Sequence, residues 1–335
     1  MIVGSSAVKV SVCVITYNHE RYIAQAIEGI LAQEVDFTYE VVVGEDCSSD
    51  NTRRVLQRYV DKYRDRITLL SRPRNLGMME NFISTVASCR GEYVALCEGD
   101  DYWTWPWKLR TQVEFLDAHS DYAIASHNVV VRSENQIRAD REWPGAAQKS
   151  VLSLRDLLRG GSGGATCSLV FRNRVFGDFP EWYGRSPGGD WALQVLCAER
   201  GRYRYFPDVM AVYRVHEHGA RHAQALKAHA RGDEVIALSS RNSMEVCDLL
   251  DRHLKYTYSG DIRVQRAFWS WLAGIDYAKA GRRRTAWSFF RNAAPYVCST
   301  GGKTTFVDVL RGCAWMLLPM KAAHLARSWR ATRWR

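Results

Sequence analysis

Three carboxylates lie close together after an apolar run in the sequence YVALCEGDDYW, residues 93–103. Glu98, Asp100 and Asp101 repel one another unless a cation lies between them. Hard divalent cations prefer oxygen ligands, and Mg²⁺ is usually shared between one or two carboxylates and the phosphates of a substrate. A simpler alternative is that Gly99, Asp100 and Asp101 form a turn that caps the next helix. The position directly after a strand-like run favours a cation held against a diphosphate.

Two further polar clusters follow strand-like runs, TYNHE at residues 16–20 and GEDCSSDNT at residues 44–52. In an open α/β sheet, functional groups gather at the carboxyl ends of the strands, so we expect all three clusters at one edge of the sheet. The sequence contains neither a GxGxxG loop after the first strand nor a GxxxxGK[ST] loop anywhere. The segment RGGSGGATC, residues 159–167, lacks a suitably placed lysine and indicates a flexible loop.

The elements that position these clusters follow from apolar periodicity. Apolar β-rich runs alternate with amphipathic helical patterns, which is typical of a mainly parallel, Rossmann-like α/β sheet flanked by helices. The expected strands are Val10–Thr16, Tyr39–Gly44, Ile67–Leu70, Tyr93–Cys97, Ala123–Val131, Cys167–Phe171 and Asp208–Arg214. The expected helices are Arg21–Ala32, one capped by Ser49 and Asp50 and running through Tyr63, Asn81–Ala87, Lys108–Ala118 and Asp190–Glu199. Residues 133–165 indicate a long loop with a short helix.

The pattern becomes helical from residue 220 onward, which predicts two parts, a catalytic domain at 1–219 and a basic helical region at 220–335. The chain of 335 residues carries a net charge of +10, and residues 220–335 hold 20 Lys and Arg against 8 Asp and Glu. Such a basic part suggests either an anionic partner or a solvated helical face. The chain is 47% hydrophobic, which is enough for a large core.

Cysteine usage and the ends of the chain bear on its location. The nine cysteines are spaced singly, without zinc-site spacing, and most lie in apolar runs, as buried reduced thiols do. We see no secretory signal in the first residues and no apolar run near the roughly 20 residues that span a bilayer. The expectation is a cytoplasmic protein.

Five segments, in order, resemble the family 2 glycosyltransferases, whose GT-A fold binds nucleotide sugars. They are VSVCVITYNHERYIAQAIEGILAQ, YEVVVGEDCSSDNT, NLGMMENF, GEYVALCEGDDYW and GGDWALQV. The resemblance covers residues 8–218, and five ordered motifs are far less probable by chance than one. It implies a GT-A catalytic domain, a nucleotide-sugar donor and a divalent metal, Mn²⁺ or Mg²⁺.

The resemblance also implies which residues bind the nucleotide sugar. Thr16, Tyr17 and Asn18 match the first-strand motif that contacts the nucleotide, and Asp46 matches the aspartate that holds the base. Members usually have Asp-Asp-Gly-Ser where this chain has Glu-Asp-Cys-Ser at residues 45–48. Asp46 keeps its place while its two neighbours differ.

The carboxylate cluster matches the DXD-type signature of the family, which touches the ribose and the metal. The resemblance assigns Asp100 to both the nucleotide sugar and the metal, and Asp101 to the metal. Glu98, which replaces the commoner first aspartate, is expected to support them.

Basic residues after a late strand match a further family position near the diphosphate or the metal. In YRVHEHG, His216 fits a metal ligand best and His218 comes second, while Arg214 is a candidate countercharge for phosphate. A lone histidine is more commonly not a ligand, so that alternative stays open.

Asp190, in SPGGDWALQ, matches the motif that ends in the catalytic base. An acceptor hydroxyl is a poor nucleophile, so a carboxylate within hydrogen-bond reach is needed to accept its proton. The implied reaction is a single displacement at C1 of the sugar with inversion, the metal stabilising the departing nucleoside diphosphate. The local sequence alone favours Asp190 as the N-cap of a helix, and both roles are compatible.

The C-terminal residues have an amphipathic pattern. Phe306, Leu310, Cys313, Leu317 and Met320 recur at helical spacing, followed by basic residues without acidic neighbours. This segment is expected either to lie on the anionic inner face of the cell membrane, near a lipid-linked acceptor, or to pack on the catalytic domain.

The leading hypothesis is therefore a metal-dependent, inverting glycosyltransferase of cell-surface polysaccharide synthesis. It would move a sugar, from UDP by preference, to a glycan or lipid-linked acceptor. A catalytically silent nucleotide-sugar-binding or scaffold protein is the alternative, and retention of Asp46, Asp100, Asp101 and Asp190 together argues against it. No nucleic-acid-binding motif accompanies the basic C-terminal part, so no nucleic-acid partner is expected.

Overall fold

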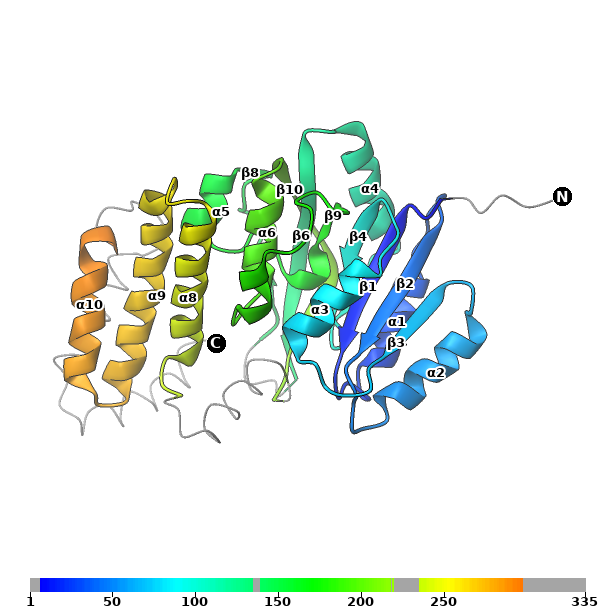
Figure 1. Ribbon diagram of the computed structural model, residues 1–335, viewed down its shortest axis with the longest axis horizontal. Helices are drawn as coiled ribbons and strands as arrows, with labels where there is room; N and C mark the ends of the chain where they lie inside the picture. Colours follow the sequence, from blue (N-terminus) through cyan, green and yellow to red (C-terminus); the bar gives the residue numbers. More distant parts are fainter. Residues whose placement is uncertain (1–6, 135–138, 218, 220–234, 298–335) are drawn as a thin grey trace. The chain divides into compact units, whose positions relative to one another are not determined.

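The computed structural model describes residues 7–134, 139–217, 219 and 235–297. The chain divides into two compact units, Met1–Gly219 and Ala220–Arg335. The first unit contains a ten-stranded sheet with flanking helices, and the second is helical over its described residues (Figure 1).

The sheet of the first unit has the strand order β3-β2-β1-β4-β9-β6-β10-β5, with β7 paired to β6 and β8 to β10. Its strands are β1 (Val10–Thr16), β2 (Tyr39–Glu45), β3 (Ile67–Ser71), β4 (Tyr93–Leu96), β5 (Tyr102–Trp103), β6 (Tyr122–Ser133), β7 (Arg141–Trp143), β8 (Val151–Leu152), β9 (Val170–Arg172) and β10 (Arg202–Val215). Parallel ladders join β1, β2, β3 and β4, and also β6 and β10. Antiparallel ladders attach the short strands β5, β7, β8 and β9. The sheet is therefore mixed, with its longest ladders parallel.

Helices cover this sheet. They are α1 (Ile23–Leu31), α2 (Thr52–Lys62), α3 (Met78–Ala87), α4 (Lys108–Ala118), α5 (Leu154–Gly160) and α6 (Asp190–Ala198), with 3₁₀ turns η1 (Thr166–Ser168) and η2 (Glu181–Arg185). Helix α3 packs on β1 and β2, α4 on β6 and β9, and α6 on β6 and β10. Nearly every residue of β1, β2 and β4 is buried, as in strands covered on both faces. The expected α/β fold is confirmed.

Strand register brings the three polar clusters to one edge. Thr16, the last residue of β1, pairs with Glu45, the last residue of β2. Leu96, which ends β4, pairs with Cys13 of β1. The loops that follow β1, β2 and β4 therefore leave the sheet at the same edge, as the sequence predicts.

Two strand predictions need correction. The first half of the expected strand Cys167–Phe171 is the 3₁₀ turn η1, which is held by a 2.6 Å hydrogen bond from the Ser168 hydroxyl to the Ala165 carbonyl. Gln112 donates a 2.9 Å bond to the Ser168 carbonyl and fixes the same turn. The expected strand Asp208–Arg214 is only the second half of β10, because register shifts let the chain pass Pro207 without ending the strand.

The second unit contains α8 (Leu238–His253), α9 (Ser259–Lys279) and α10 (Arg283–Val297). Trp271 of α9 packs on Phe290 of α10 with ring centroids 4.6 Å apart. A Cβ at Gly274 would lie 2.6 Å from the Phe290 ring, so the absence of a side chain lets the two helices approach closely. The predicted amphipathic segment 306–320 and the basic residues after it lie outside the described residues.

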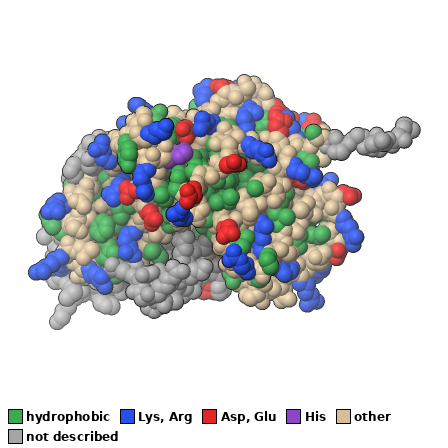
Figure 2. All heavy atoms as spheres, viewed as in Figure 1, with side chains coloured by type: hydrophobic (Ala, Val, Ile, Leu, Met, Phe, Trp, Pro, Cys, Tyr) green, Lys and Arg blue, Asp and Glu red, His purple; other side chains and the backbone are tan. Residues whose placement is uncertain are grey.

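Three further properties of the described residues concern the surface charge, the apolar character of the helices and the cysteines. Lys and Arg side chains are spread over the face drawn in Figure 2 and do not gather into one band on it. Within the described ranges, no helix has both the length and the apolar character needed to cross a lipid bilayer. All seven cysteines in these ranges are free thiols.

Candidate active site

The turn after β4 presents Asp100 at the edge of the sheet. The Asp101 amide donates to the Glu98 carbonyl at 3.0 Å, and the Gly99 amide donates to the Ile15 carbonyl of β1 at the same distance. A Cβ at Gly99 would lie 2.6 Å from Thr16 Oγ1, so only glycine lets this turn approach β1 so closely. The turn alternative is therefore right, but the turn does not cap a helix, because β5 intervenes before α4 begins.

His19, Asp100 and His216 converge at this edge. Their candidate ligand atoms all lie within 4.8 Å of one another. Asp100 Oδ2 is 3.0 Å from His216 Nε2 and 3.7 Å from His19 Nε2. The His216 side chain is 1% exposed, the His19 side chain 14% and the Asp100 side chain 18%. Two imidazoles and a carboxylate at these separations can hold a divalent cation.

Burial and charge act in opposite directions on these groups. Burial penalises the charged form of Asp100, yet the adjacent His19 and His216 outweigh it and lower the pKa of that carboxyl. Burial lowers the pKa of His19. Asp100 is thus kept ionised, as a metal ligand must be.

Asp101 is not one of the three residues whose candidate ligand atoms lie within 4.8 Å of one another. Its Oδ1 accepts a 2.8 Å hydrogen bond from the Arg214 amide, and the residue is buried. Burial, with the negative charges of Asp100 and Glu98, holds the pKa of Asp101 well above its usual range. Asp101 therefore ties the turn to β10 through Oδ1, while its Oδ2 is buried without a hydrogen-bond partner, and its role toward a metal stays a prediction.

The Arg214 side chain is also engaged at the turn. Its Nη1 donates to the Asp100 carbonyl at 2.5 Å, and its Nη2 donates to Gln25. The guanidinium lies 5.1 Å from the ring centroid of Tyr22 and 4.4 Å from that of Tyr102. These contacts make Arg214 a support for the Asp100 backbone, and its role toward phosphate stays a prediction.

Asp190 is the first residue of α6 and its side chain is exposed. Gly189 is the N-cap, so the alternative that Asp190 caps the helix is wrong. Burial, then the charges of Asp100 and Asp190, raise the pKa of Glu98 to about 8. Asp190 is thus close enough to the carboxylate turn to act on it electrostatically, although α6 lies far away in sequence.

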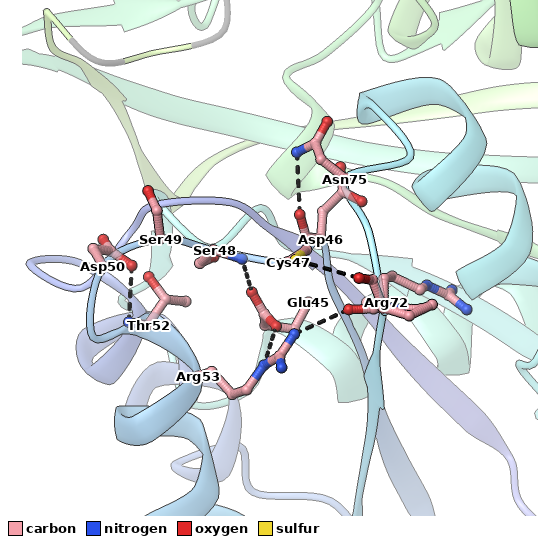
Figure 3. A network of polar contacts seen from close by, with 12 residues as sticks. Glu45, Asp46, Cys47, Ser48, Ser49, Asp50, Thr52, Arg53, Arg72 and Asn75 are labelled. Atoms are coloured by element: carbon pink, nitrogen blue, oxygen red, sulfur yellow. Dashed lines mark hydrogen bonds and ion pairs between the residues drawn. The ribbon is translucent and has the colours of Figure 1, made fainter.

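The loop after β2 is a network of polar contacts (Figure 3). The Asp46 carboxylate accepts hydrogen bonds from the amides of Leu76 and Gly77 at 2.7 and 2.9 Å. Glu45, fully buried, accepts from the Ser48 amide at 2.6 Å and from Arg53 Nε at 2.7 Å. Both acidic side chains therefore shape the loop, and contact of Asp46 with a base stays a prediction.

Cys47 accounts for one departure from the family pattern. Its φ is +59°, in the left-handed region that favours glycine, which is the residue that the family usually has here. In this chain a cysteine adopts this conformation.

The loop after β1 is tied to the loop after β2. Asn18 Oδ1 accepts from the Ser49 amide at 2.8 Å, and the Asn18 amide donates to the Ser48 hydroxyl at 3.0 Å. Thr16 is buried, whereas Tyr17 is 44% exposed at the surface of this loop. The predicted nucleotide-contacting residues are thus adjacent, and the Asp46 amide joins them through a 3.0 Å bond to the Thr16 carbonyl.

Two residues need separate mention. His218 lies outside the described residues. His19 was missed by the sequence reasoning, although it lies in the polar cluster TYNHE after the first strand. Its proximity to His216 depends on the fold, and the available signal was a metal-ligating residue type at the carboxyl end of a strand.

Comparison with known proteins decides the family. The profile of Glycosyl transferase family 2 matches residues 11–177. The chain belongs to glycosyl transferase family 2. An uncharacterized protein of Mycobacterium tuberculosis is 38% identical to this family 2 chain over 214 residues, which are 64% of this chain and 60% of that relative. The chain therefore matches only about three fifths of that relative's length.

Solved structures confirm the GT-A fold of this family 2 chain. Staphylococcus aureus TarS 1-349 in complex with UDP-GlcNAc is 19% identical, with a TM-score of 0.51 over 86% of this chain and 89% of that one. The mannosyltransferase PcManGT of Pyrobaculum calidifontis, in complex with GDP-Man and Mn²⁺, is 17% identical, with a TM-score of 0.55 over 98% of this chain and 88% of that one. At these identities the likeness establishes the fold alone.

Proposed function

We propose that this chain transfers a sugar from a nucleoside diphosphate donor, UDP by preference, to a hydroxyl of a glycan or lipid-linked acceptor, with inversion at C1. Membership of glycosyl transferase family 2 supports a glycosyltransferase. The two neighbours in the GT-A fold were solved with UDP-GlcNAc and with GDP-Man, which supports a nucleotide-sugar donor.

The convergence of Asp100, His19 and His216 at the edge of the sheet carries this proposal. Burial first, and then the negative charges of Asp100 and Asp190, raise the pKa of Glu98, which supports a position of Asp190 facing the same site. Asp190 is exposed and is not used as the N-cap of α6. An accessible carboxylate beside the donor site is what is needed to accept the proton of an acceptor hydroxyl.

The loops after β1 and β2 would hold the donor. Thr16, Tyr17 and Asn18 are proposed to contact the nucleotide, and Asp46 the base. The amides of Leu76 and Gly77 fix the Asp46 carboxylate in place, so the loop is ordered before any nucleotide arrives. A pre-ordered loop loses little conformational entropy on binding.

Asp100 and His216 would hold a divalent cation, with Asp101 tying the turn to β10. Their separation of 3.0 Å and the ionised state of Asp100 fit a cation site. When bound, the cation would stabilise negative charge on the diphosphate as it departs. The residues of the chain orient the donor, and Asp190 takes the proton from the acceptor.

Replacement of Asp190 by Asn tests the proposal because it removes the charge and keeps the size of the side chain. Sugar transfer and hydrolysis of UDP-GlcNAc should fall by at least about 100-fold, whereas UDP-GlcNAc affinity, measured by calorimetry, should stay within about twofold. Glu199→Gln is the matched control, because it removes a carboxylate that follows the last residue of the same helix. Retained turnover in Asp190→Asn would exclude Asp190 as the base.

We also propose that the acceptor belongs to cell-surface polysaccharide synthesis at the inner face of the cell membrane. The excess of 20 Lys and Arg over 8 Asp and Glu in residues 220–335 supports attraction to anionic lipids. The full chain and a chain ending at residue 303 are compared for partition into vesicles containing anionic lipid. Equal partition would exclude a membrane role for the last residues.

A further inference from the structure

The His19 side chain is placed at the site by a fixed backbone. The His19 amide donates to Thr52 Oγ1 of α2 at 2.8 Å. Its carbonyl accepts from the amides of Tyr22 and Ile23 at 2.9 Å, at the start of α1. The ring is therefore presented by two helices, and removal of the ring leaves these backbone contacts intact.

The His19 ring has no hydrogen bond among the described residues. Its buried Nδ1 is without a hydrogen-bond partner, and its Nε2 is 3.7 Å from Asp100 Oδ2, which is beyond hydrogen-bond distance. His216 Nε2 already occupies that oxygen at 3.0 Å. A cation bound beside Asp100 would give His19 Nε2 a partner, while His19 Nδ1 would stay buried without one.

A cation between these groups would account for the approach of both imidazole Nε2 atoms to Asp100 Oδ2. Metal bonds of about 2.1 Å place neighbouring ligand atoms about 3.0–3.5 Å apart. The two contacts of Asp100 Oδ2, at 3.0 and 3.7 Å, bracket that range, and all three candidate atoms lie within 4.8 Å. The set would be complete once the His19–Asp100 contact and the distance between the two imidazole nitrogens both fall within that range.

We infer that His19 is a third protein ligand of the cation, and that the resulting set of two imidazole nitrogens and one carboxylate oxygen selects transition-series divalent ions over Mg²⁺. Imidazole suits transition ions, whereas Mg²⁺ prefers oxygen ligands and water. The other aspartate of the turn, Asp101, accepts from the Arg214 amide and is not one of these three residues. The inference deepens the proposed function, on which it rests, by naming the class of cation.

The test uses the full-length chain with metal alone. Co²⁺ binding is followed by visible absorption, Mn²⁺ binding by electron paramagnetic resonance, and Mg²⁺ binding by displacement of Mn²⁺. The wild-type protein should bind Co²⁺ and Mn²⁺ at least about tenfold more tightly than Mg²⁺. His19→Ala should weaken Co²⁺ binding by about 10- to 100-fold and change the Co²⁺ spectrum, with less than about threefold effect on Mg²⁺.

His119→Ala is the matched control, because His119 is an exposed histidine whose Nδ1 contacts a carbonyl of its own helix, α4. Circular dichroism checks the fold, and His19→Gln replaces His19→Ala if the alanine variant does not fold. Wild-type Co²⁺ affinity and spectrum in the folded variant, or equal affinity of the wild-type protein for Mg²⁺ and Co²⁺, would overturn the inference.

Assays of UDP-GlcNAc hydrolysis separate this inference from the proposed function. If the wild-type protein hydrolyses UDP-GlcNAc and His19→Ala binds Co²⁺ normally, the inference fails and the function stands. If His19→Ala loses Co²⁺ while the wild-type protein neither transfers nor hydrolyses any nucleotide sugar, the metal site stands and the proposed function fails.

Discussion

Lys108, the first residue of α4, is a fully buried lysine. Its Nζ donates a 2.9 Å hydrogen bond to Gln112 Oε1 and lies 4.1 Å from the ring centroid of Trp103. None of the ion pairs found in the described residues includes Lys108. Burial lowers the pKa of Lys108 to about 7 from the usual value of 10.5.

This shift makes stability depend on pH in a defined direction. Below about pH 7, Lys108 is protonated in both the folded and unfolded chain, and folding carries the full cost of burying the charge. Between about pH 7 and 10.5, the unfolded chain holds a proton that the folded chain has released, so the free energy of unfolding rises with pH. The maximum slope is about 1.4 kcal/mol per pH unit, or about 2 kcal/mol between pH 7.5 and 9.

Lys108→Met removes the charge and keeps an unbranched side chain in the same space. Urea unfolding is followed by tryptophan fluorescence at several pH values for the wild-type protein and this variant. The wild-type free energy of unfolding should gain about 2 kcal/mol relative to Lys108→Met between pH 7.5 and 9. Lys62→Met, which alters an exposed lysine at the end of α2, should follow the wild-type curve. Parallel curves for the wild-type protein and Lys108→Met would refute the argument.

Three further substitutions have defined expected outcomes. Gly99→Ala places a Cβ 2.6 Å from Thr16 Oγ1, so the free energy of unfolding in urea should fall by about 1–3 kcal/mol and Co²⁺ should bind more weakly. Unchanged Co²⁺ binding would contradict the close packing of this turn on β1. Asp46→Asn turns one of the two oxygens that accept from the amides of residues 76 and 77 into an NH₂ group, so the free energy of unfolding should fall by about 1–3 kcal/mol and UDP should bind more weakly in calorimetry. An unchanged free energy of unfolding would show that the loop does not need both acceptors. Trp271→Ala should cost the second unit about 3–5 kcal/mol in thermal unfolding, and an unaltered transition would exclude Trp271 from its core.

The regular parts of the fold could be predicted from local pattern. Strand Val10–Thr16 and helix Lys108–Ala118 have the bounds that apolar periodicity gives them. Residues 166–168 could not be assigned correctly, because the turn there depends on Gln112, which approaches from another element. The first half of β10 was missed because Arg202 and Arg204 interrupt its apolar pattern, although their guanidinium groups lie over aromatic rings.

The candidate site was predictable in part. Residue types at the carboxyl ends of strands pointed to Asp100, and the family motif pointed to His216; the structure places the two in contact. His19 was missed because no local pattern indicates that a histidine after the first strand faces one that follows the last. The hydrogen bond between Asp101 and the Arg214 amide of β10 was also beyond sequence reasoning, because it depends on a strand far away in the sequence.

The hydrogen bonds between the loops after β1 and β2 have a consequence for exchanging either loop with that of a relative. Backbone amides of one loop bond to side chains of the other, as in Asn18 with Ser48 and Ser49, and His19 with Thr52. A chimaera that takes only one loop from a relative would leave donors and acceptors mismatched across the junction. Residues 16–20 and 45–52 should therefore be exchanged together.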